Sequence, residues 1–306
     1  MTVAAGLIAS RFIHYAALTI LFGAAFFPVY TYRENKPAPP KPAGFLSWLR
    51  RVLIGAAIAA LVSGMFWFGF VAATMSGEPS ALYDANILWE VIRTTEFGSV
   101  WAPHLGLIGL ALILLLPKQS SELLRLAVLG LAAIALTSIA DTGHAGAENG
   151  PRAGLHIIAD AAHLLAAGVW IGALVVLTRF GMTAVRYRRD GDLKTFDHAL
   201  TRFSAIGPIV VAALALSGIL NPGFLSSLKS AYGRVLLAKL LLFAAMLLLA
   251  AANRVWLAPR LQLALKSGAD PQAPTRALRV SVLIETALAA LVLAAVGWLG
   301  TLAPPR

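Results

Sequence analysis

The chain has 306 residues, of which 59% are hydrophobic and only 13% are charged. A soluble domain carries about a quarter charged residues, so this composition excludes an ordinary soluble protein. Several apolar runs exceed the roughly 20 residues that a helix needs to span a bilayer. Because these runs are continuous rather than alternating, they predict an all-α polytopic membrane bundle and exclude a β-barrel. The chain has no cysteine, so a soft metal would have to be bound by His and Met.

Eight transmembrane helices are expected in chain order. Their predicted bounds are about 7–31, 52–74, 100–117, 123–140, 155–178, 204–225, 234–257 and 280–302. We divide the chain into an N-terminal four-span part, 1–140, and a C-terminal four-span part, 141–306, within one membrane unit that has no soluble domain.

The segment between the second and third spans contains "ALYDANILWEVIRTTEF". Leu88, Val91 and Ile92 recur there at helical spacing, which predicts a short helix. We expect this helix to lie on the outer surface of the membrane, with Trp89 as its interfacial anchor.

Positive charge is distributed unevenly among the loops. Most of the 25 lysines and arginines fall in the first, third, fifth and seventh loops. The positive-inside rule places these loops in the cytoplasm and both termini outside. The net charge of +11 therefore indicates membrane orientation rather than a nucleic-acid partner. The chain lacks the GxxxxGK[ST] phosphate-binding motif, and we expect a multi-pass protein of the lipid bilayer that is not an enzyme.

Five of the six histidines map to the outer half of the predicted bundle, and neutral imidazole is a common metal ligand. These five are His14, His104, His144, His156 and His163. Met65, in the outer half of the second span, would add a thioether ligand that suits Cu(I). The alternative is that these residues are structural, with hydrogen bonds between helices or gap-filling packing. His198 lies in the charged fifth loop, where we expect it to be solvated.

The stretch "GLHIIADAAHLLAAGVWIGAL" at 154–174 combines a membrane span with ionisable groups. At about 100° per residue, His156, Asp160, His163 and Trp170 share one stripe of the helix. His156 and His163 are about 10 Å apart along the axis, so they form two stations rather than one site. Asp160 is within reach of both and would orient an imidazole ring. Charged side chains inside a bilayer commonly mark an ion path, although interhelical hydrogen bonding is the alternative.

The inner half of the predicted bundle contains a second acidic position. Glu285 lies in the eighth span, and Asn253 lies at a similar depth in the seventh. These spans form a hairpin, so we expect the two side chains to be close. They would form an inner ion station, a proton relay or a plain interhelical hydrogen bond. Lys239, one turn into the seventh span from outside, is expected to extend outward or to pair with Asp160.

Several motifs resemble those of the CopD/PcoD family of copper-resistance membrane proteins. "DTGHAGAENG" followed by "LHIIADAAHLLAAGVWIGAL" has the family's Gly-His, Asp-x-x-His and Trp-x-Gly pattern. "YGRVLLAKLLLFAAMLLLAAANRVWLAPRL" and the Glu of the last span also match, so the resemblance is strongest over about 141–302. It supports His144, Asp160, His163 and Trp170, which lie on the motif, more strongly than His156, which does not.

The resemblance implies a bacterial inner-membrane protein that moves copper, as Cu(I) or Cu(II), or contributes to copper tolerance. It also implies a separate periplasmic copper-binding partner of CopC type. Copper would be captured by the outer histidines and Met65, passed along His163 and Asp160, and released past Glu285. The alternative from a different class is an electron carrier that binds b-type haem, with axial histidines from the fifth span and from His14 or His104.

Overall fold

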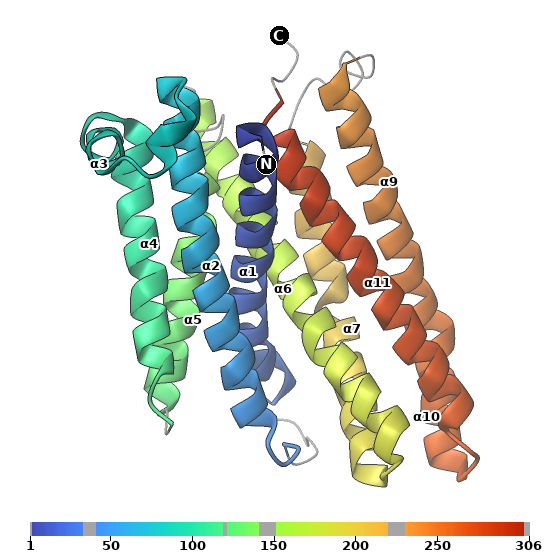
Figure 1. Cartoon of the computed structure of the whole chain (residues 1–306). Coiled ribbons are helices and arrows are strands. Elements are labelled where there is room, and N and C mark those ends of the chain that lie inside the picture. The colour runs from blue at the N-terminus through green and yellow to red at the C-terminus, as the bar shows by residue number, and fades with distance from the viewer. Residues whose placement is uncertain (1, 33–40, 119–120, 141–150, 220–229, 303–306) are drawn as a thin grey trace.

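The computed structural model is a helical bundle, which confirms the all-α prediction. It describes residues 2–32, 41–118, 121–140, 151–219 and 230–302. The long helices run up and down along a common direction, and the start of α1 and the end of α11 lie at the same end of the bundle (Figure 1). This arrangement follows from an even number of crossings.

Eight of the described helices correspond to the eight predicted spans. They are α1 (Val3–Thr31), α2 (Phe45–Ser76), α4 (Glu96–Leu115), α5 (Glu122–Thr137), α6 (Pro151–Tyr187), α7 (Asp190–Ile219), α9 (Ala231–Ala252) and α11 (Gln272–Leu299). Seven stretches of the described chain are long and apolar enough to cross a membrane, and α5 is not among them. With 16 residues, α5 extends about 24 Å, so the fourth predicted span is the shortest.

Four shorter elements complete the described chain. They are the 3₁₀ turn η1 (Pro79–Leu82), α3 (Ala85–Thr94), the π-helical segment η4 (Asn253–Leu257) and α10 (Ala258–Ser267). The predicted helix between the second and third spans is therefore present as α3. Val91 is buried beneath it, whereas Trp89 is 59% exposed. Attachment of Trp89 to a membrane surface stays a prediction.

The ends of several helices are set by local side-chain chemistry. Thr2, Ser121 and Ser230 begin α1, α5 and α9, and each hydroxyl accepts a hydrogen bond from a backbone N–H in the first turn. Gly77 and Gly268 follow α2 and α10 with φ of 75° and 71°, the left-handed conformation that commonly ends a helix. Helix bounds thus follow from residues that satisfy the terminal backbone groups.

α1 packs against helices from both halves of the chain, and glycine makes its closest contact possible. At the α1–α6 crossing, Gly23 lies directly against Gly168 and Gly172, and a Cβ on Gly23 or Gly172 would overlap the backbone of the other helix. A pair of small residues four apart is a frequent solution for close packing between membrane helices. The contact of Gly168 and Gly172 with α1 therefore sets the depth of Trp170, which lies on the other side of α6.

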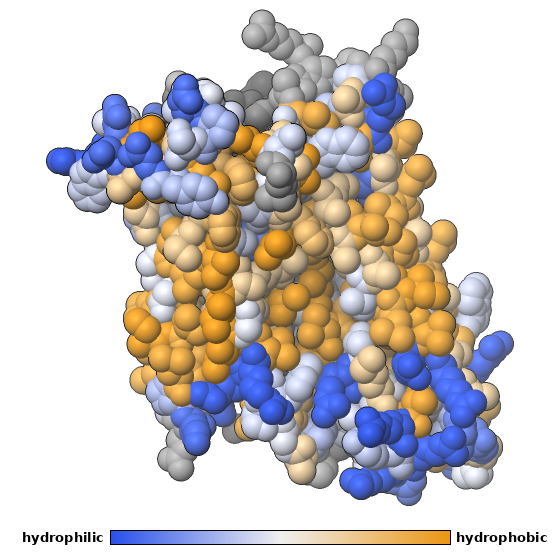
Figure 2. Space-filling view, viewed as in Figure 1, coloured by the Kyte–Doolittle hydropathy of each residue, from blue (hydrophilic) through white to orange (hydrophobic). Residues whose placement is uncertain are grey.

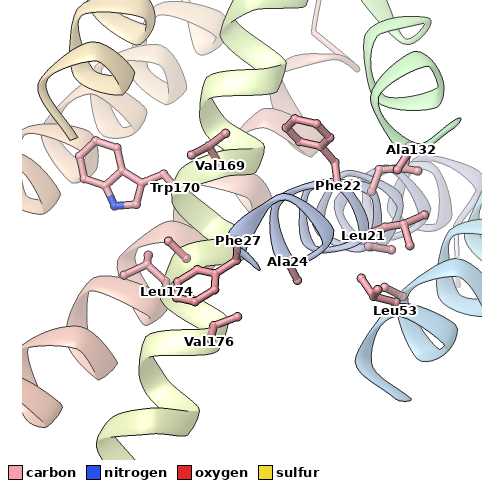
Figure 3. Packing of buried hydrophobic residues seen from close by; sticks show 14 of the residues in the cluster. Leu21, Phe22, Ala24, Phe27, Leu53, Ala132, Val169, Trp170, Leu174 and Val176 are labelled. Atoms are coloured by element: carbon pink, nitrogen blue, oxygen red, sulfur yellow. The ribbon is translucent and has the colours of Figure 1, made fainter. Parts of the chain in front are cut away.

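The core follows α1 through the centre of the bundle. Figure 3 shows Leu21, Phe22 and Phe27 of α1 between α2, α5 and α6, and Trp170 on the side of α6 that faces away from α1. The surface has a hydrophobic belt between two polar ends (Figure 2). The end that contains α10 and the α6–α7 turn is rich in arginine and lysine, in agreement with the positive-inside orientation.

The segment expected to be a charged fifth loop is mostly helical. α6 continues to Tyr187 and α7 begins at Asp190, so a turn of two residues joins them. The expectation that His198 is solvated within a loop is wrong. His198 lies in α7, where buried neighbours such as Phe196 and Ala199 pack the helix inward, and its Nε2 is 2.9 Å from the Thr31 carbonyl oxygen.

Candidate metal centre

Two predicted ligands meet in the N-terminal half of the bundle. His14 of α1 and His104 of α4 are 0% and 1% exposed, and their Nε2 atoms are 2.8 Å apart. These residues are 90 positions apart in the sequence. Their contact therefore depends on how α1 and α4 are rotated in the bundle, and it creates a buried pair of facing imidazole nitrogens.

Backbone contacts determine which nitrogen of His14 carries hydrogen. Its Nδ1 is 2.9 Å from the Ala60 carbonyl oxygen and 3.2 Å from Ser63 Oγ. A carbonyl oxygen can only accept, so Nδ1 of a neutral ring donates here. The Ser63 hydroxyl in turn donates to the Ala59 carbonyl at 2.6 Å. The Nε2 lone pair of His14 is consequently presented to His104.

His104 has two available proton arrangements because its partner is a hydroxyl. Its Nδ1 is 2.8 Å from Ser138 Oγ, which is also 2.9 Å from the Ala135 carbonyl oxygen. If Ser138 donates to Nδ1, then Nε2 of His104 carries hydrogen and donates to His14. If Ser138 donates to Ala135, then Nδ1 carries the hydrogen and two Nε2 lone pairs face each other. The second arrangement would offer two nitrogen donors to a metal ion.

Tryptophans enclose the pair. The Trp101 ring is 4.7 Å from that of His104, and the Trp67 ring is 5.5 Å from that of His14. Trp101 Nε1 donates to the Gly64 carbonyl at 3.1 Å. A Cβ at position 64 would lie 3.0 Å from His14 Cε1, so glycine leaves the space that the imidazole occupies. The rings of His14 and His104 thus have a fixed position in an apolar, aromatic environment.

The predicted stripe on α6 forms a second group of polar side chains. His163 Nδ1 is 2.8 Å from Ser217 Oγ of α7. Asp160 lies within electrostatic reach of His156 and of Lys239 on α9, which favours pairing with Asp160 over outward extension, the two alternatives expected for Lys239. All four ionisable side chains are half-buried. The outer histidines therefore divide into two groups rather than converging on one centre.

Met65, another predicted ligand, is not part of either group. Met65 is 56% exposed on α2, whereas Ser63, Gly64 and Trp67 on that helix are buried towards the pair. His144 lies outside the described residues. Among the residues that the structure describes, no group of three or more His, Cys, Asp or Glu side chains is arranged to hold a metal ion. The described centre is thus a site with two nitrogen donors.

The prediction that Asn253 and Glu285 are close is confirmed. Glu285 is 2% exposed in the middle of α11. Its Oε1 accepts a hydrogen bond from Trp170 Nε1 at 2.6 Å, and its Oε2 accepts one from Asn253 Nδ2 at 3.2 Å. Three helical segments, α6, η4 and α11, thus meet at one carboxyl group.

Comparisons with known proteins identify the family. Residues 1–155 match the N-terminal domain model of copper resistance protein D-like proteins, and residues 197–299 match the copper resistance protein D model. Copper resistance protein D of Pseudomonas syringae pv. tomato is 32% identical, over 97% of this chain and 96% of that protein. The chain belongs to the copper resistance protein D family.

Two further relatives agree with this family assignment. Inner membrane protein YebZ of Escherichia coli is 30% identical over 97% of this chain and 98% of that protein. Copper transport protein CutJ of Bacillus subtilis is 27% identical over 80% of this chain, which spans 46% of that protein. No solved structure matches this copper resistance protein D family member. The family and its apolar helices place the chain in the bacterial inner membrane as a multi-pass protein.

Sequence reasoning missed several residues that hold the histidine pair of this family member in place. Trp67, Trp101, Ser63 and Ser138 all contact the histidine pair. A signal was present on α2, where Ala60, Ser63, Gly64 and Trp67 share one helical face. Arg11 was also missed, and its guanidinium carbon lies 4.5 Å from the centre of the Trp67 ring.

Proposed function

We propose that this protein transports or handles copper in the bacterial inner membrane without acting as an enzyme, and that His14 and His104 form its copper-binding centre. The single observation that carries the proposal is the pair of buried Nε2 atoms 2.8 Å apart. Imidazole is a good ligand for copper. The names of the Pseudomonas and Bacillus relatives refer to copper resistance and copper transport.

The chemistry of the centre favours Cu(I) over Cu(II). Both donors are neutral, and no carboxylate of a described residue contacts either ring. The cost of burying an ion rises with its charge, so a monovalent cation is tolerated here better than a divalent one. Trp101 stacks on the His104 ring, and the Arg11 guanidinium over Trp67 is a nearby positive charge that further disfavours a divalent ion. Two nitrogens on opposite sides of the ion suit a linear two-coordinate site.

Copper binding requires a small opening and a shift of one proton. A metal–imidazole bond is about 2.0 Å, so the two Nε2 atoms must separate to about 4 Å. The hydrogen on His104 must reside on Nδ1, with Ser138 donating to the Ala135 carbonyl. Because both rings stay neutral overall, binding Cu(I) releases no net proton. The pair can therefore load and unload copper without creating a second buried charge.

The group on α6 offers the next step of a path. Tyr15 follows His14 directly on α1 and lies within electrostatic reach of Asp160. Asp160, with His163 on the same stripe of α6, would therefore be the next group that copper meets from α1, before Glu285. A separate periplasmic copper-binding protein of CopC type would supply the metal at the outer end. In this route copper enters from outside and is released inward.

The geometry does not favour the haem alternative. An axial pair of histidines must leave a flat slot for a macrocycle between the two nitrogens. Here the nitrogens are in hydrogen-bond contact, and Trp67, Trp101 and Ser138 occupy the surroundings of the rings. A purified protein that shows a Soret band and no copper would overturn the proposal.

The test is a Cu(I) titration of the purified protein against a chromogenic competitor, followed by X-ray absorption. We expect one equivalent of Cu(I) with two nitrogen neighbours. His14→Ala and His104→Ala should each lose this equivalent. His198→Ala is the matched control, because His198 of α7 also contacts a carbonyl oxygen, that of Thr31 at the far end of α1 from the pair.

Folding of the variants is checked by size-exclusion chromatography and circular dichroism. His104→Gln provides a milder variant that retains a polar group of similar length. Wild-type stoichiometry and an unchanged absorption edge in folded His14 and His104 variants would overturn the assignment. In that case the same titration of His163→Ala and Asp160→Asn would locate the centre on α6.

A further inference from the structure

The carboxyl group of Glu285 lies in the middle of the bundle without an opposite charge. Glu285 is the 14th of the 28 residues of α11. Its two oxygens accept hydrogen bonds from Trp170 and Asn253, which are both neutral. Neither hydrogen bond supplies a positive charge, and an isolated ionised carboxylate is costly to bury. A proton is the ion that removes this cost.

The charged and titratable side chains of the elements around α11 have other neighbours. Those elements are α1, α6, α9, η4 and α10. On α1, Arg11 lies over Trp67 and close to Tyr15, His14 contacts His104, and Tyr30 packs on Phe27. On α6, His163 contacts Ser217, Arg179 lies over Trp48, and His156 and Asp160 are close to each other. Lys239 of α9 is also close to Asp160, and Arg254 of η4 donates to the Ser204 carbonyl.

The remaining charged groups lie towards the ends of these helices. Arg186, Arg260 and Lys266 are exposed, and Tyr232 and Arg234 belong to the first turn of α9. On α11 itself, Arg279 lies six residues before Glu285, about 9 Å along the axis. Among the described residues, Glu285 thus has Trp170 and Asn253 as its polar partners.

Asn253 provides an acceptor that the present arrangement does not use. Its Nδ2 donates to Glu285, whereas its Oδ1 is buried without a hydrogen-bond partner among the described residues. An unsatisfied buried acceptor costs about 1–3 kcal/mol. Half a turn of the amide exchanges Nδ2 and Oδ1. A protonated Glu285 could then donate its O–H to Oδ1, while Trp170 continues to donate to Oε1.

We propose that Glu285 is a proton-binding site within the membrane and that the Asn253 amide reverses when the proton binds. The ionised carboxylate accepts from Asn253 Nδ2. The neutral carboxylic acid donates from Oε2 to Asn253 Oδ1. Trp170 holds the other oxygen in both states, so the carboxyl group keeps its position while its charge changes.

Two local features fit a site that exchanges protons. Asn253 begins η4, a π-helical segment, and single π turns within α-helices occur often at functional sites. Ser281 lies one turn before Glu285 on the same face of α11, and its buried hydroxyl has no hydrogen-bond partner among the described residues. This hydroxyl offers a step towards the cytoplasmic end of α11.

Infrared difference spectroscopy of the protein in liposomes tests this proposal without copper. Spectra are compared between about pH 4 and pH 9, the range that brackets ordinary and raised carboxyl pKa values. We expect acid to produce the carbonyl-stretch band of a protonated carboxyl in the wild type. The other carboxyl groups of the chain contribute to this band, so Glu285→Gln should lack the component of Glu285, and the exposed control Glu90→Gln should retain it.

Glu285→Gln is expected to fold, because Gln can accept from Trp170 and donate to Asn253 Oδ1. Asn253→Leu gives a second test, since it leaves the protonated acid without its acceptor. We expect the band to move to the frequency of a carboxyl O–H that lacks this partner. A pH-difference spectrum of Glu285→Gln that equals the wild type overturns the proposal. A retained band with no shift in Asn253→Leu overturns the role of the amide.

Discussion

The histidine pair and the Glu285 site are both buried, yet they differ in the properties that select a cation. The pair consists of neutral nitrogen donors beside tryptophan rings, and His14 is oriented by the Ala60 carbonyl. Glu285 has a carboxyl group, and the amide oxygen of the neighbouring Asn253 has no hydrogen-bond partner among the described residues. Neutral imidazole donors suit a copper ion, whereas an unpaired buried carboxyl group suits a proton.

The difference between the two sites teaches that copper and a proton can be bound by different residues in this fold. The pair is built by α1, α2, α4 and α5, and the carboxyl site by α6, η4 and α11. α1 is the helix that touches both regions, through His14 and through its glycine contact with α6. A relative movement at this contact would therefore affect both sites.

The largest expected effect comes from the contact that joins the two regions. In Gly172→Leu, the new side chain would overlap the backbone of Gly23 and Ala24. Overpacking of a close helix contact costs about 3 kcal/mol or more, so we expect loss of a stable fold and of both sites together. Thermal unfolding in detergent measures this. Gly55→Leu, where the added atoms meet open space, should keep the wild-type midpoint, and equal midpoints in both variants would contradict the role of the crossing.

A second prediction tests whether the two regions act independently. His104→Ala should weaken Cu(I) binding by about 100-fold, which equals about 2.7 kcal/mol, because one of two ligands is removed. The carboxyl infrared band should be unchanged in that variant. Glu285→Gln should show the reverse, with Cu(I) affinity within about twofold of wild type. Loss of both properties in either folded variant would show that the sites are one unit.

Substitution of Ser138, which contacts His104 of the pair, is expected to have an intermediate effect on Cu(I) affinity. Ser138→Ala removes the hydroxyl that faces His104 Nδ1 and leaves both ligands in place. Groups that orient a ligating imidazole contribute about 10-fold or more to metal affinity, so we expect a tenfold weaker Cu(I) Kd. Competitive titration measures the change. Ser63→Ala should have less effect because His14 Nδ1 keeps the Ala60 carbonyl, and the opposite ranking would be evidence against the proton arrangement.

The smallest effect concerns the charges between α6 and α9. Asp160 and Lys239 are half-buried, and their opposite charges lie close enough to attract each other. Asp160→Asn and Lys239→Gln should each lower the thermal midpoint, and the double variant should lose less than the sum. We expect a coupling of about 1 kcal/mol from this double-mutant cycle. Additive losses would show that the two groups are independent.

The spans were predictable because bilayer thickness imposes a minimum length of apolar sequence. The Asn253–Glu285 contact was predictable because the two residues lie at similar depth on helices that follow each other. The His14–His104 pair was not, although both residues were expected as ligands. Its formation depends on the rotation of α1 and α4, which rests on contacts such as Gly64 against His14.

Other errors have a similar physical origin. Charge in the segment 179–202 suggested a loop, but buried residues at helical spacing, among them Phe196 and Leu200, extend α6 and α7 beyond the apolar belt. The five outer histidines were expected on one side, and depth alone could not separate those on α1 and α4 from those on α6. The sequence pattern predicts how deep a residue lies in the membrane. Which side chain it contacts depends on the rotation of each helix about its axis.

The π-helical segment η4 makes the chain sensitive to length in a way that substitutions do not reveal. A π turn contains one more residue than the α-helical turn it replaces. Deletion of one residue between Ala252 and Ala258 would permit an uninterrupted α-helix from α9 through α10. Because the deletion removes the extra residue of the π turn itself, the helix after it would keep about the same rotation relative to the helix before it. Leu261 would stay in the core, but the wide turn that begins at Asn253 would be lost, so a shortened chain could keep its helix content and still lose the contact between Asn253 and Glu285.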